Sequence, residues 1–142
     1  MRLSKENRQA SLKMGQAFFR TAKAVFGEKS MDDCFENIKK NRNIGNYCVA
    51  VGYWAGVFDI PLREALQAFV FNGINNLVQV GTKIIPLGQS ESQNMLYSVY
   101  PQMLGTIEEL LSKRDWEVTN FVPAQDILSM QHERLYTRLY MS

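Results

Sequence analysis

The chain has 142 residues, of which 46% are hydrophobic and 21% are charged. This composition is typical of a globular protein, and the length suits one hydrophobic core better than two domains. Sixteen basic residues stand against 14 acidic ones, for a net charge of +2. Because the two charges nearly balance, we do not expect the chain to bind nucleic acid or an anionic membrane by charge. The expected partner is therefore a protein.

The sequence predicts a cytoplasmic protein. Its first residues are polar and carry both charges, unlike a secretory signal. The longest apolar region, after Pro61, is interrupted by Gln67, Asn72 and other amides, which argues against a membrane span. The two cysteines, Cys34 and Cys48, form no CxxC pair and are too few for a disulfide scaffold.

The first predicted element is an amphipathic helix in the first 26 residues. One face is formed by residues at spacings of three and four, all but Thr21 apolar: Ala10, Met14, Ala17, Phe18, Thr21 and Val25. Gly27 is the predicted stop, because glycine adopts a left-handed conformation without steric cost. Ser30 then offers an N-cap to a short helix that contains Met31, Phe35 and Ile38.

The run from Tyr47 to Phe58 is almost wholly apolar and indicates a buried helix or strand. Its alanines and glycines favour a closely packed helix. Asp59 is the predicted cap of the next helix, with Pro61 in the first turn.

That next helix carries one long apolar stripe and further apolar residues outside it, as expected of a central helix with several neighbours. The stripe consists of Leu62, Leu66, Phe69, Val70, Gly73, Ile74, Leu77, Val78 and Gly81.

A turn at Pro86, Leu87 and Gly88 precedes a second long apolar pattern. That pattern consists of Leu96, Val99, Tyr100, Met103, Leu104, Ile107, Leu110 and Leu111. Pro101 lies inside it and predicts a kink or a break near Tyr100. A short helix after Pro123 and a tail complete the chain.

The expected fold is therefore all-α. We expect a single compact domain over residues 1–142 with about five to six helices, in which residues 117–142 form the C-terminal helix and an interaction tail.

Catalytic chemistry is not expected. His132 is the only histidine, and the pair with Glu133 is not the HExxH that places two imidazoles on one helical face. Pro86 to Gln89 contains one glycine and no lysine, so a structural turn is a better interpretation than a phosphate loop. No cofactor or metal site is predicted within one chain. The alternative that remains open is a small metal carrier that combines His132 and Cys48 in a dimer.

The tail has the composition of an interface rather than of a loose end, because aromatic and arginine side chains dominate protein contacts. The candidate partner-binding residues are Arg134, Leu135, Tyr136, Arg138, Leu139, Tyr140 and Ser142.

Two stretches resemble the UreF family of urease accessory proteins. The segment from Gly52 to Leu96 resembles an apolar helix, an x-x-P-L-x-E-A-L helix start, a long asparagine-containing helix and a P-L-G-Q turn. The ending "DILSMQHERLYTRLYMS" matches D-I-x-S-M-x-H-E-x-x-Y-x-R-L-F-x-S at ten positions. Asn46 and Tyr140 depart from the residues that are usual in the family.

This resemblance implies a non-enzymatic scaffold for nickel insertion into apo-urease, and it makes nickel the metal of the alternative carrier that uses His132 and Cys48 in a dimer. It implies a homodimer whose tail binds the accessory protein UreD or UreH, with Arg138 helping to recruit the GTPase UreG and Tyr136 and Leu139 as apolar anchors. Family members begin with further helices, so we also expect apolar surface that those helices would cover.

Overall fold

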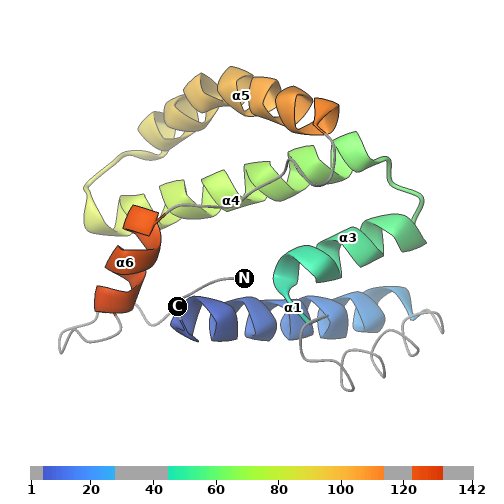
Figure 1. Ribbon diagram of the computed structural model, residues 1–142. Helices are drawn as coiled ribbons and strands as arrows, with labels where there is room; N and C mark the ends of the chain where they lie inside the picture. Colours follow the sequence, from blue (N-terminus) through green and yellow to red (C-terminus); the bar gives the residue numbers. More distant parts are fainter. Residues whose placement is uncertain (1–4, 28–44, 114–122, 133–142) are drawn as a thin grey trace. The chain divides into compact units, whose positions relative to one another are not determined.

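A computed structural model describes residues 5–27, 45–113 and 123–132 (Figure 1). Within these ranges the chain forms five α-helices and no strand, which confirms the predicted all-α class. The chain divides into two compact units: Met1–Phe58 with Asn120–Ser142, and Asp59–Thr119. The short helix predicted after Ser30 and the C-terminal tail lie outside the described residues.

The first unit contains α1 (Lys5–Phe26), α3 (Tyr47–Val57) and α6 (Pro123–His132). Helix α1 ends where predicted. Gly27 has a φ of +62°, and its N–H donates to the Lys23 carbonyl oxygen at 2.9 Å. A left-handed glycine closes the last turn in this way because it has no Cβ.

The buried face of α1 differs from the predicted stripe. It consists of Ser11, Gly15, Phe19 and Ala22, whereas Met14 is 47% exposed. The cause is a close approach of the backbone that leads into α3. A Cβ on Gly15 would overlap the Gly45 carbonyl oxygen, and the Tyr47 N–H donates to Ser11 Oγ at 3.2 Å. Ser11 and Gly15 therefore occupy the part of this face that meets the backbone before α3, where a larger side chain would not fit.

The core between α1 and α3 is small, and aromatic side chains pack at its edge. Phe19, Ala22 and Ala50 are buried, with Phe18 and Trp54 packed against them. Ring contacts continue toward the end of α3, where Trp54 lies 4.9 Å from Phe26 between ring centroids. Aromatic pairs at such separations add to the stabilisation from burial alone.

The apolar run of α3 is a helix, as predicted, but its close packing uses alanines instead of glycines. Ala50 and Ala55 are buried. Additional Cβ atoms on Gly52 and Gly56 would meet nothing within 4 Å. Helix α3 therefore buries one side, and its apolar character extends to the exposed side as well.

The second unit is a hairpin of α4 (Leu62–Ile84) and α5 (Gln89–Ser112) (Figure 1). The predicted cap at Asp59 is wrong, because the N-cap is Pro61, whose carbonyl oxygen accepts from the Ala65 N–H at 3.0 Å. Asp59 instead adopts a left-handed φ of 51° in the turn before the helix.

The turn between α4 and α5 lies at the predicted position. The Gly88 N–H donates to Glu91 Oε2 at 2.7 Å, which satisfies a backbone donor at the start of α5. Helix α5 then buries one face at helical spacing, made of Ser92, Leu96, Met103 and Ile107. At the open end of the hairpin, Arg63 of α4 pairs with Glu108 of α5.

Two further expectations concern this unit. Of the kink or break that Pro101 predicts, the structure has no break, because α5 is continuous through Pro101, but its ribbon bends instead of forming one straight rod (Figure 1). Helix α4 has no fully buried residue and packs against α5 within its unit, and its role as a central helix with several neighbours stays a prediction.

Candidate functional site

The predicted partner-binding residues lie outside the described part of the chain. They are Arg134, Leu135, Tyr136, Arg138, Leu139, Tyr140 and Ser142. The structure describes the helix that leads into them, α6, which ends at His132. Helix α6 is therefore the described element that lies next to that site along the chain.

Helix α6 faces α1 with polar side chains. Asn7 Nδ2 donates to Ser129 Oγ at 2.6 Å, and His132 Nδ1 lies 3.8 Å from Glu6 Oε2. Ser129 and His132 are three positions apart, so they share one helical face. Among the α6 side chains that the structure describes, these two are the ones that are half-buried.

The apolar side chains of α6 are exposed. Ile127 is 56% exposed, Leu128 65% and Met130 47%. A surface helix normally turns its apolar stripe inward, so this orientation is the reverse of the usual one. Sequence reasoning used Ile127 and Met130 as matches to a family pattern and missed the surface, because periodicity does not tell which side of a short helix faces its neighbour.

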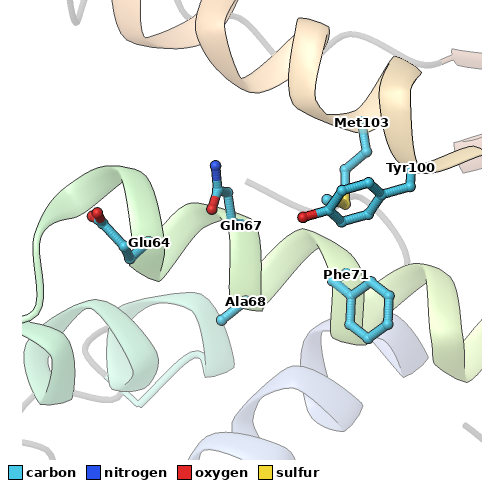
Figure 2. Close-up of a pocket in the computed structure, with 6 residues that line it drawn as sticks. All are labelled: Glu64, Gln67, Ala68, Phe71, Tyr100 and Met103. Atoms are coloured by element: carbon cyan, nitrogen blue, oxygen red, sulfur yellow. The ribbon is translucent and has the colours of Figure 1, made fainter.

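The hairpin carries a shallow groove of about 380 Å³, shown in Figure 2. Tyr100 and Met103 project from α5 toward α4, which contributes the other lining residues: Glu64, Gln67, Ala68 and Phe71. Glu64 is the charged group of this lining, and the lining contains no histidine or cysteine. The groove offers apolar contact and a few hydrogen bonds, without a nucleophile and base at bonding distance.

The two residues of the alternative nickel site do not form a metal cluster in the described residues. His132 lies beside Glu6, and Cys48 is an exposed free thiol in the first turn of α3. Across residues 5–27, 45–113 and 123–132, no three histidine, cysteine or acidic side chains gather where they would hold a metal. In the same part of the chain, no helix is both long and apolar enough to cross a membrane.

Comparison with known proteins is consistent with the resemblance seen in the sequence. The family model described as UreF matches residues 1–100. Among similar proteins, each named urease accessory protein UreF, that of Picosynechococcus sp. is 29% identical over 99% of this chain and 62% of its own length. That of Sporosarcina pasteurii is 29% identical over 100% of this chain and 70% of its own length.

A third relative, from Actinobacillus pleuropneumoniae serotype 5b, is 30% identical over 99% of this chain and 62% of its own length. The chain therefore spans about three fifths to seven tenths of the length of these curated relatives.

Proposed function

The chain belongs to the UreF family, and on that premise we propose that it acts in urease maturation as a non-enzymatic accessory protein. The names of its relatives support the assignment to urease. The described surfaces support a scaffold, because every described helix exposes large apolar side chains that other proteins could cover.

The proposed mechanism is assembly in the cytoplasm. The chain, as a homodimer, binds UreD or UreH through residues 134–142 and presents a combined surface to UreG, which delivers nickel to apo-urease. The observation that carries this proposal is the orientation of α6, which exposes Ile127, Leu128 and Met130 immediately before the candidate binding residues. An exposed apolar cluster beside an arginine-rich and tyrosine-rich segment has the composition of an interface.

Removal of the residues after Leu135 tests the role of the tail. We expect the shortened chain to keep its helical circular dichroism and melting temperature, because the described core comes from α1 and α3. Co-purification with UreD or UreH should be lost. The exchange Gln131→Ala, at an exposed position of α6, serves as the matched control and should retain binding. Undiminished capture of the partner by the shortened chain would refute the tail assignment.

Recruitment of UreG is tested by Arg138→Ala, with Lys83→Ala at an exposed position of α4 as a control for loss of one positive charge. We expect Arg138→Ala to reduce UreG binding to the preassembled complex while both variants melt like the parent. Equal UreG binding by both variants would contradict the role of Arg138.

The nickel-carrier alternative predicts something different for the isolated chain. Imidazole and thiolate are strong nickel ligands, so a carrier would show tight binding in equilibrium dialysis that His132→Ala abolishes. The scaffold proposal expects weak nickel binding by the isolated chain, unchanged by His132→Ala.

A further inference from the structure

Helix α1 has a second face that its own unit leaves open. Five of its residues alternate at spacings of four and three and form this face, which we call the open seam: Ala10, Met14, Ala17, Thr21 and Ala24. Ala10 is half-buried, whereas the other four are exposed, Met14 to 47%. The helix packs on α3 through another side, which carries Phe19 and Ala22. Most of the open seam is therefore free to contact another molecule.

A basic edge runs beside the open seam. Lys13 and Arg20 directly precede Met14 and Thr21, so both lie along the same edge. Both basic side chains are exposed, and neither forms an ion pair with another described residue. No acidic residue stands three or four positions from either of them, where a solvent-facing helix commonly places an ion-pair partner. Two positive charges therefore lie two turns apart, with no acidic side chain one turn away along α1.

We propose that the open seam binds an amphipathic helix of another protein, and that acidic side chains of this helix pair with Lys13 and Arg20. Residues at alternating spacings of four and three are the pattern by which two helices pack side by side, and charges that flank such a seam select the partner. The alanines let the partner helix approach closely, and the flexible side chain of Met14 adapts to the opposing surface. Because Lys13 and Arg20 are seven residues apart, the partner needs acidic residues seven positions apart beside its own apolar stripe.

Other occupants fit this face less well. Two copies of the open seam would either oppose their own Lys13 and Arg20 or leave both charges unpaired. A helix that lies on a membrane presents large side chains such as tryptophan, phenylalanine and leucine, whereas this seam offers one methionine among alanines and a threonine. An acidic helix satisfies both the charge and the shape of the face.

The test uses the isolated chain and two designed peptides, so its result does not depend on the urease proposal. Both peptides are helices of about three heptads with the same leucine stripe. They differ only in the residues beside that stripe, which are glutamate in one peptide and lysine in the other. Binding is measured by fluorescence anisotropy of the labelled peptide. We expect the glutamate peptide to bind about twofold to thirtyfold tighter, the range that two exposed ion pairs provide.

The decisive variant is Lys13→Glu combined with Arg20→Glu. It should reverse the preference, so that the lysine peptide binds tighter than the glutamate peptide. Lys83→Glu combined with Lys113→Glu is the matched control, because both lysines are exposed and lie in the other unit. This control changes the net charge of the chain by the same amount and should keep the preference for the glutamate peptide. Circular dichroism checks that both variants fold like the parent.

A second pair of variants tests the apolar part of the open seam. Met14→Gln places a polar side chain of similar length in the seam and should weaken binding of the glutamate peptide by about threefold to tenfold. Met95→Gln on α5 is the control, because Met95 is 46% exposed and Met14 is 47% exposed. The control should bind the peptide as the parent does.

Four results would overturn the proposal. Equal binding of the two peptides, or an unchanged preference after Lys13→Glu with Arg20→Glu, would mean that the basic edge does not select the partner. Phosphatidylserine vesicles or a DNA duplex that bind the parent as tightly as the glutamate peptide would mean that the basic edge accepts any anion. A dimer of the chain that Met14→Gln dissociates in sedimentation would assign the open seam to a second copy.

Discussion

The tightest contact in the first unit predicts that Gly15→Ala is destabilising. A Cβ at this position would overlap the Gly45 carbonyl oxygen and lie 3.1 Å from the Asn46 carbonyl carbon. Both are backbone atoms, so the clash cannot be relieved by rotation of a flexible side chain. The start of α3 would have to move away from α1.

The magnitude follows from two opposing effects. Overpacking a tight interface costs about 1–3 kcal/mol, and a backbone clash belongs at the upper end of that range. Replacing glycine by alanine inside a helix raises the free energy of unfolding by up to about 1 kcal/mol. The net loss in free energy of unfolding is therefore about 2 kcal/mol, which corresponds to a fall in melting temperature of roughly 4–8 °C for a chain of this size.

The matched control is Gly52→Ala in α3, where an added Cβ meets nothing within 4 Å. This variant should be neutral or more stable than the parent by up to about 1 kcal/mol. Urea unfolding followed by circular dichroism gives both differences from the shift in midpoint at constant slope. Equal stabilisation by the two exchanges would refute the close approach at Gly15.

Three further predictions concern single side chains. Phe19→Ala removes a ring that is 1% exposed and should cost about 3–5 kcal/mol in chemical unfolding, whereas Met14→Ala, at a 47% exposed position, should cost less than about 1 kcal/mol. The hydrogen bond from Lys113 and its charge hold the pKa of Glu109 below its usual value. The contribution of this pair to the stability of the fold is therefore present above about pH 4.5 and disappears as the pH falls through the lowered pKa. A carboxyl NMR titration should show the pKa of Glu109 rising toward its ordinary value in Lys113→Met; no rise would contradict the pairing. Pro101→Ala restores a backbone donor inside α5 and should raise the melting temperature, and a lower melting temperature would mean that the curvature of α5 is needed for packing.

Much of the helical content could be predicted from the sequence, because it depends on local signals. Gly27 ends α1, the turn at Gly88 separates α4 from α5, and Pro123 begins α6, all as their conformational preferences dictate. The stripe of α5 also predicted three of its buried residues correctly: Leu96, Met103 and Ile107. A hydrophobic pattern succeeds where one helix packs its larger apolar side chains against another.

The same reasoning failed where packing depends on small residues. The face of α1 around Gly15 is defined by the approach of a backbone carbonyl, and no hydrophobicity pattern contains that information. The side chain of Asp59 predicts a helix cap, but Asp59 lies in the turn before α4 with a φ of 51°. The N-cap residue of α4 is Pro61. Both errors arise because tertiary geometry overrides a local preference.

The candidate site was less accessible to prediction than the fold. Composition predicts a binding role for residues 134–142, which lie beyond the described residues and remain a prediction, whereas the hydrogen bond between Asn7 and Ser129 depends on which side of α6 meets α1. Ser129 and Asn7 are 122 positions apart, and neither has a sequence signal of pairing. Contacts of this kind follow from the fold and not from any local pattern.

The distribution of exposed apolar side chains connects the fold to the proposed scaffold. Every described helix carries at least two large hydrophobic residues that are more than a third exposed, among them Val25, Tyr53, Leu77, Tyr97 and Leu128. Scattered exposed hydrophobics are ordinary, but Tyr97 on α5 is 82% exposed and Leu77 on α4 is 74% exposed, so each leaves most of its side chain uncovered. Their uncovered apolar area is therefore available for association. A protein that acts by bringing other proteins together requires such surface, whereas an enzyme requires a converging set of reactive groups.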